Sequence, residues 1–124
     1  MQSEPASTGL GFLAPSGRLD AAAAPHLQDE FTAQFDQGNR YLIVNLAGVP
    51  YVSSSTLRVL LVARKRAIRA GGDLILCCLL PHVSRVISMI GFDQIFTICA
   101  SEDEARQLAS SMQATAGSSS EEQP

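Results

Sequence analysis

The fold is decided by the stretch Tyr41-Leu-Ile-Val-Asn-Leu-Ala-Gly-Val-Pro-Tyr-Val-Ser-Ser-Ser-Thr-Leu-Arg-Val-Leu-Leu61. Its near-continuous apolar run, Leu42 to Leu46, predicts a strand that is buried on both faces. A turn with glycine and proline follows, and the hydroxyl cluster from Ser53 to Thr56 then opens a segment whose apolar residues have helical spacing. The stretch therefore predicts a strand, a short loop and a helix whose first turn carries four hydroxyls.

Strand and helix patterns alternate on both sides of this stretch. Further strands are expected at residues 10–13, 73–80 and 96–99. Four helices are expected: from near Asp20 to Gly38 with Pro25 in the first turn, from Ser55 to Ala70, from Pro81 to Gly91, and from a capping box at 101–104 to Met112. Such alternation predicts an α/β domain with a mixed, mainly parallel sheet of four to five strands packed against about four helices. The early strand or strands are expected to be antiparallel partners at one edge.

The two ends of the chain differ in composition from its middle. Residues 1–8 are small and polar, and we expect them to be flexible. Residues 113–124 are rich in serine and glutamate and bury too little apolar surface to offset the entropy of ordering, so a disordered tail is expected there. A single folded domain is therefore predicted over residues 9–112.

Bulk properties exclude several classes of protein. The formal net charge of -3 and the pI near 5.2 argue against a nucleic-acid partner, because nucleic-acid-binding domains are usually basic. No apolar run reaches the length that crosses a bilayer, so no membrane insertion is expected. The first residues lack the basic start and apolar core of a secretory signal, which predicts a cytoplasmic protein.

Neither metal binding nor catalysis is predicted. Cys77, Cys78 and Cys99 fall in expected strands among apolar neighbours, which favours buried free thiols. His26 and His82 each follow a proline at an expected helix start, and we read them as surface or capping residues. No nucleophile has a base nearby in sequence, so we expect a non-enzyme without cofactors. A small hydrolase that uses one of the serines is the enzyme-class rival.

The hydroxyl cluster has two readings. Helix capping needs only one hydroxyl, whereas four in a row also offer a kinase places to put a phosphate, which the open N–H groups of a helix start hold favourably. Arg58, Lys65, Arg66 and Arg69 form a basic stripe that is either a solvated face or a docking surface for an acidic partner. Asp20 is either a helix cap or part of a partner-facing rim.

Four segments in this order resemble the STAS domain family, named for sulfate transporters and anti-sigma factor antagonists. They are the segment from Ser16 to Pro25, the quoted stretch, the pair Gly71-Gly72, and Ile90-Gly-Phe-Asp-Gln-Ile-Phe96. The resemblance spans roughly residues 9 to 112. It is closest to the free-standing bacterial anti-sigma factor antagonists.

The resemblance implies a phospho-acceptor at Ser55, with Ser54 and Thr56 as its neighbours. The family usually has Asp at the position of Ser53 and Gly at the position of Thr56. The first change removes a carboxylate beside the acceptor, and the second adds a β-branched side chain that we expect to hinder docking of a kinase. The partner-binding residues implied are Asp20, Ser53, Ser54, Ser55, Thr56, Leu57 and Arg58.

The resemblance also implies the partners. In the family, an anti-sigma factor with a histidine-kinase-like ATPase fold phosphorylates the serine, and a phosphatase restores it. The unmodified antagonist binds the anti-sigma factor and frees the sigma factor, which is partner-switching control of transcription. The alternative function is a STAS subunit associated with a lipid or anion transporter. Homodimerisation is left open.

Overall fold

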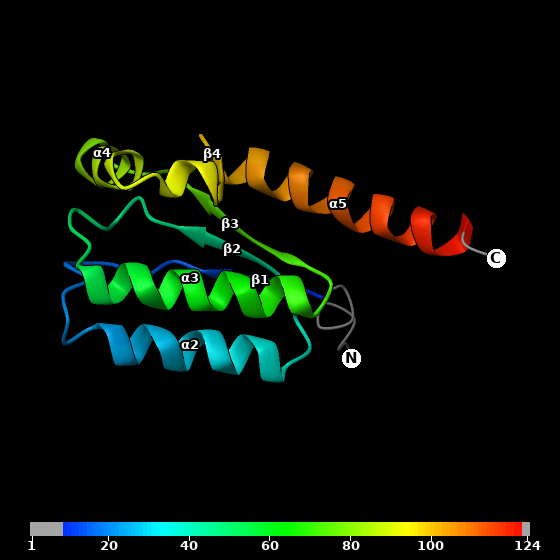
Figure 1. Cartoon of the computed structure of the whole chain (residues 1–124), viewed down its shortest axis with the longest axis horizontal. Helices are drawn as coiled ribbons and strands as arrows, with labels where there is room; N and C mark the ends of the chain where they lie inside the picture. Colours follow the sequence, from blue (N-terminus) through cyan, green and yellow to red (C-terminus); the bar gives the residue numbers. More distant parts are fainter. Residues whose placement is uncertain (1–8, 123–124) are drawn as a thin grey trace.

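The computed structural model describes residues 9–122, and in them strands and helices alternate as predicted (Figure 1). The elements are β1 (Leu10–Leu13), α2 (Ala24–Asp36), β2 (Tyr41–Asn45), α3 (Ser54–Arg69), β3 (Asp73–Cys77), α4 (Pro81–Met89), the 3-10 helix η1 (Phe92–Gln94), β4 (Thr97–Cys99) and α5 (Glu102–Glu122). The predicted α/β class is confirmed, with four strands and four α-helices. None of the helices in residues 9–122 is long and apolar enough to cross a membrane.

All four strands are parallel, and they lie in the sheet in their order along the chain. Leu10 pairs with Tyr41, and Tyr41 pairs in turn with Asp73. The expectation of an antiparallel early strand is therefore wrong. The reason is that α2 lies between β1 and β2 and carries the chain back to the end at which β1 began, so β2 runs in the same direction.

Sequential order also decides which helices cover which face. Right-handed crossovers place the three connecting helices, α2, α3 and α4, on one face of the sheet, and α5 covers the opposite face (Figure 1). Because side chains alternate along a strand, β2 and β3 supply both cores. Leu42 and Leu74 face the three-helix side, whereas Ile43 and Ile75 face α5.

The bounds of α2 are close to the predicted ones. The helix α2 begins at Ala24, and Asp20 caps the turn before it, since the Asp20 carboxylate accepts a hydrogen bond from the N–H of Ala23 at 3.1 Å. Pro25 lies in the first turn, as predicted. Gly38 has the predicted positive φ, of 90°, which lets the chain leave α2 at little conformational cost.

The helix α5 begins at the predicted capping box and runs further than predicted. The Ser101 hydroxyl accepts from the N–H of Glu104 at 3.1 Å, and the Glu104 carboxylate accepts from the N–H of Ala100 at 2.7 Å. The helix continues to Glu122, across most of the segment 113–124 for which we expect a disordered tail. Residues 113–123 contain no proline, and they include the good helix formers Gln and Ala, so the backbone can continue. The segment predicted to be flexible, residues 1–8, lies outside the described residues.

Candidate partner-binding site at the start of α3

Two loops at the carboxyl edge of the sheet hold the start of α3. The loop after β2 lies beside the loop after β1, because β1 and β2 are parallel neighbours. Gly17 donates its N–H to the Gly48 carbonyl and Leu19 to the Tyr51 carbonyl, both at 2.9 Å. In the opposite direction, Ser53 donates its N–H to the Leu19 carbonyl at 2.8 Å. These hydrogen bonds join the loops after β1 and β2 into one unit, which we call the double-loop platform, and α3 begins on it.

The hydroxyl cluster occupies the first turn of α3, as the sequence predicts. Ser53 is the N-cap, and its hydroxyl oxygen accepts from the N–H of Thr56 at 3.2 Å. Ser54 is exposed and Ser55 is half-buried. Within the described part of the chain, neither of these two hydroxyls has a hydrogen-bond partner. One serine thus caps the helix, and two hydroxyls are left over at its positive end.

Thr56 and Leu57 face the core instead of a partner. Thr56 is fully buried, and its hydroxyl donates to the Leu19 carbonyl at 2.8 Å. Leu57 is 7% exposed. The expectation that Thr56 would hinder docking is wrong for this structure, because the side chain points away from the surface. Thr56 fastens α3 to the double-loop platform through this hydrogen bond, and Leu57 belongs to the hydrophobic core.

Exposed charged side chains lie on the first turns of α3 and in the loop beside it. Arg58 is exposed one turn after Ser55, and Asp20 is exposed in the neighbouring loop. Arg18 stacks on the Tyr51 ring, with its guanidinium carbon 4.2 Å from the ring centroid. The sequence does not predict this pair, since its two residues meet only when the two loops are brought together. Both cations and one carboxylate are therefore available to a partner.

Asn45 ties this edge of the sheet to α5. Its side-chain oxygen accepts from the N–H of Ala47 at 2.9 Å, and its side-chain nitrogen donates to the Glu102 carboxylate at 3.0 Å. Arg106 also pairs with Glu102, at 2.9 Å. The hydrogen bond from Asn45 and then the pairing with Arg106 lower the pKa of Glu102 from its ordinary value of 4.5. The carboxylate is thus held in its charged form as the link between β2 and α5.

The cysteines and histidines differ in burial. Cys77, Cys78 and Cys99 are all free; Cys78 lies just after β3 and is half-buried, whereas the other two are buried as predicted. Burial raises the pKa of Cys77 to about 12 and also raises that of Cys99, which disfavours the reactive thiolates. His26 and His82 are exposed near helix starts, as predicted. No group of three potential metal ligands occurs among the described residues.

Comparison with known proteins gives one family model and several relatives. Residues 5–105 match the model described as the STAS domain. A candidate anti-sigma factor antagonist of Bordetella bronchiseptica, BtrV, is 38% identical over 97 residues, which make up 78% of this chain and 84% of the relative.

Two solved structures share the fold. A crystal structure of a candidate anti-sigma factor antagonist from Thermotoga maritima has a TM-score of 0.77 at 22% identity and covers 82% of this chain and 87% of that one. The phosphorylated form of SpoIIAA, a cell-fate determinant of Bacillus, has a TM-score of 0.60 at 22% identity and covers 77% and 86% of the two chains. At these identities the structures support the architecture, and the family rests on the model and on BtrV.

Proposed function

Because the chain belongs to the STAS domain family, we propose that it is an anti-sigma factor antagonist that binds a kinase-type anti-sigma factor and so frees a sigma factor. The 38% identity to BtrV across most of both chains supports this choice within the family. The protein acts in this account as a cytoplasmic binding module and not as an enzyme. Its partners are the kinase and a phosphatase that reverses the modification.

The observation that carries the proposal is the pair of unpartnered hydroxyls in the first turn of α3. Ser55 is the proposed acceptor, with Ser54 beside it. A phosphate adds about two negative charges and is stabilised by the N-terminal end of a helix. Arg58 follows three residues later, on the same side of the helix, and is placed to pair with the phosphate. The modification therefore changes the charge of the surface without disturbing the core.

The partner-facing surface in this proposal differs from the one that the sequence suggests. It consists of Asp20, Ser53, Ser54, Ser55 and Arg58, with Arg18 and Tyr51 added from the loops. Thr56 and Leu57 support it from below. Since Ser53 already caps the helix, it serves the partner only through its exposed atoms. The absence of the family's aspartate at this position leaves the acceptor without a carboxylate two residues before it in the chain.

Phosphosite mapping after incubation with the cognate kinase tests the proposal. We expect phosphate on Ser55, none on Ser55→Ala, and normal modification of the control Ser84→Ala, which removes an exposed hydroxyl from α4. We also expect Ser55→Glu to weaken binding of the anti-sigma factor, whereas Ser84→Glu leaves it unchanged. Phosphate found only on Ser54 would move the acceptor by one residue. Recovery of membrane transport subunits and no kinase from cell extracts would contradict the proposal and favour the transporter-associated alternative.

A further inference from the structure

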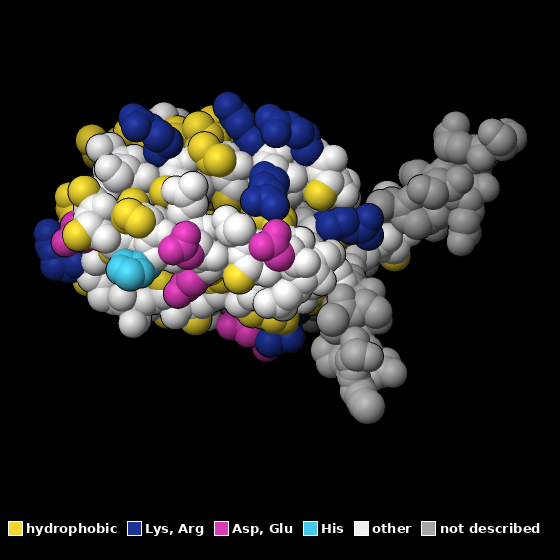
Figure 2. All heavy atoms as spheres, turned by 90° about the horizontal axis from the view of Figure 1, so that it is seen from below, with side chains coloured by type: hydrophobic (Ala, Val, Ile, Leu, Met, Phe, Trp, Pro, Cys, Tyr) yellow, Lys and Arg dark blue, Asp and Glu magenta, His cyan; other side chains and the backbone are white. Residues whose placement is uncertain are grey.

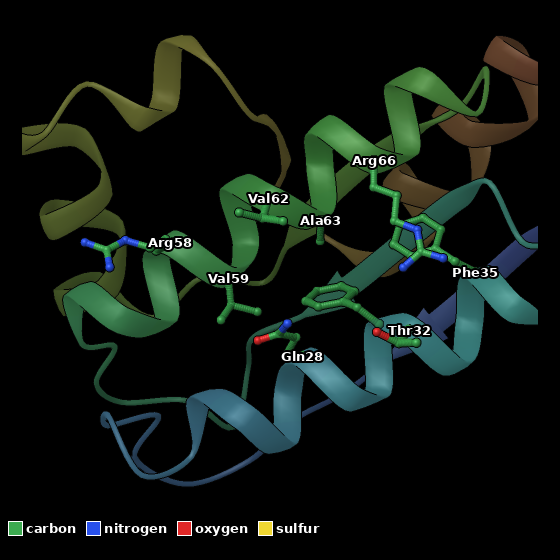
Figure 3. A pocket seen from close by; sticks show the side chains of 9 residues that line it. Gln28, Thr32, Phe35, Arg58, Val59, Val62, Ala63 and Arg66 are labelled. Atoms are coloured by element: carbon green, nitrogen blue, oxygen red, sulfur yellow. The ribbon is translucent and has the colours of Figure 1, made fainter.

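A groove runs between α2 and α3, next to the proposed site. It has a volume of about 190 Å³ and is drawn from close by in Figure 3. Its lining is mostly apolar, with Arg58 and Arg66 on the α3 side and Gln28 and Thr32 on the α2 side. The apolar lining residues are Phe31, Phe35, Val59, Val62 and Ala63. None of the lining residues is acidic.

Two apolar side chains that line the groove are partly exposed to solvent. Val62 is 56% exposed in the middle of α3, although β-branched apolar residues are normally buried. Val59 is half-buried one turn earlier on the same helix. Val59 points toward α2, and Val62 lies on the open side of α3 (Figure 3). Such a strip of apolar surface between two helices suits the apolar face of a third helix.

The charges around the groove are of one sign on the α3 side. All the ionisable residues of α3 are basic, whereas α2 carries the carboxylates Asp29, Glu30 and Asp36, and Figure 2 shows basic and acidic side chains on this face. Arg58 makes no ion pair within the described residues. Arg66 stacks on the Phe35 ring at 4.6 Å and lies 3.9 Å from the exposed Asp36 carboxylate. Of the two arginines that line the groove, Arg58, which lies close to Ser55, is therefore the one without an ion-pair partner among the described residues.

The distance between the two arginines indicates the kind of occupant. They are separated by two turns of α3, which corresponds to roughly 12 Å along the helix axis. A partner helix laid along the groove would place two acidic residues, two turns apart, near the two arginines, with apolar residues between them. A small amphipathic anion with a single carboxylate could pair with only one of the two arginines.

From this we propose that the groove between α2 and α3 receives an acidic amphipathic helix of the partner protein. Resting on the proposed function, the inference identifies that partner as the anti-sigma factor. It also gives the phosphate a physical role. Phosphorylated Ser55 would pair with Arg58, which would then no longer be available to the partner helix. The phosphate would also repel the acidic end of that helix, so the helix would be released.

The test compares binding of the anti-sigma factor to two matched variants of α3. Val62→Glu places a carboxylate inside the groove, and Ile68→Glu makes the same kind of change at a residue that is 44% exposed on α3 and does not line the groove. We expect Val62→Glu to weaken binding at least about tenfold, and Ile68→Glu to change it by less than about twofold. Circular dichroism of both variants checks that they are folded. Equal binding of Val62→Glu and the unmodified chain would overturn the inference.

Other outcomes separate this inference from the proposed function. If Ser55→Glu weakens binding and Val62→Glu does not, the groove proposal is wrong and the switch stands. If the anti-sigma factor does not bind the unmodified chain, the proposed function falls, and the groove is tested alone by NMR titration with a synthetic acidic amphipathic helix. Shifts at Val59 and Val62 would then support the groove, and their absence would overturn it. A change of oligomeric state in Val62→Glu would assign the groove to a second copy of the chain and overturn the proposal.

Discussion

At the scale of single residues, Thr56 shows how the site is held in place. Its hydroxyl donates to the Leu19 carbonyl at 2.8 Å, although 37 residues separate the two in the chain. The same carbonyl accepts the N–H of Ser53. One backbone oxygen thus joins the start of α3 to the loop after β1, and the serines project from this junction.

Replacing Thr56 by valine, which has nearly the same shape, removes only the hydroxyl. We expect Thr56→Val to lower the free energy of unfolding by about 1–2 kcal/mol, because a buried hydrogen bond is lost while the carbonyl keeps one partner. Ser54→Ala removes an exposed hydroxyl from the same turn and should change the stability by less than about 0.5 kcal/mol. Urea unfolding measures both. If the two variants are equally stable, the proposed junction does not contribute to the fold.

Part of the site follows from the sequence at this scale, and part does not. The capping role of Ser53 is local, so the hydroxyl pattern alone predicts it. The contacts from Thr56 to Leu19 and from Arg18 to Tyr51 join loops that are distant in the chain. They depend on β1 and β2 being parallel neighbours, which places the two following loops at the same edge. The antiparallel arrangement that we expected would have separated them.

At the scale of the elements, α5 is fastened to the sheet by the link between Asn45 and Glu102. The pKa of Glu102 is lower in the folded protein than its ordinary value of 4.5. The charged carboxylate therefore contributes stability above that value, and the contribution is lost as the pH falls through the lowered pKa of the folded state.

Glu102→Gln tests this link through its pH dependence. We expect the variant to be less stable than the unmodified chain at neutral pH, and the difference to shrink at an acidic pH below the lowered pKa of the folded state, where the carboxyl takes up a proton. Asp103→Asn removes a charge from the same first turn of α5 and controls for the helix dipole. Urea unfolding at the two pH values gives the comparison. A difference that is the same at both would mean that the link does not depend on the charge.

The two glycines that close α3 have different tasks. Gly71 has a φ of 93°, which ends the helix, whereas Gly72 lies against the backbone of Arg40. A Cβ at residue 72 would collide with the Arg40 carbonyl, which accepts the first hydrogen bond of β3 from Asp73. The sequence predicts the stop at this glycine pair, but it does not predict which strand approaches it.

Gly72→Ala should therefore cost about 3 kcal/mol of stability, since β2 and β3 would have to move apart. Gly48→Ala is the control, because the nearest atom to its added Cβ is the Ser16 Cβ at 3.4 Å. We expect that variant to lose less than about 1 kcal/mol. Thermal unfolding of the two proteins measures the difference. Similar stabilities would contradict the close approach at residue 72.

At the scale of the whole molecule, the parallel order of the strands gathers the proposed function on one side. The three connecting helices share a face, and the loops after β1 and β2 share an edge. The start of α3 lies where this face meets this edge (Figure 1), and Arg58, three residues after Ser55, lines the groove. The alternation of patterns predicts the α/β class, but not that all four strands are parallel. It does not predict the groove, because exposure of Val62 depends on how α2 packs against α3.

The central claim is that a phosphate at the start of α3 releases the partner by changing the charge of the surface alone. Calorimetric titration of the anti-sigma factor with the unmodified chain and with the chain phosphorylated at Ser55 tests it most directly. We predict at least about tenfold weaker binding of the phosphorylated chain, with the same thermal unfolding temperature for both forms. Equal affinities, or a loss of binding accompanied by loss of the fold, would contradict the account.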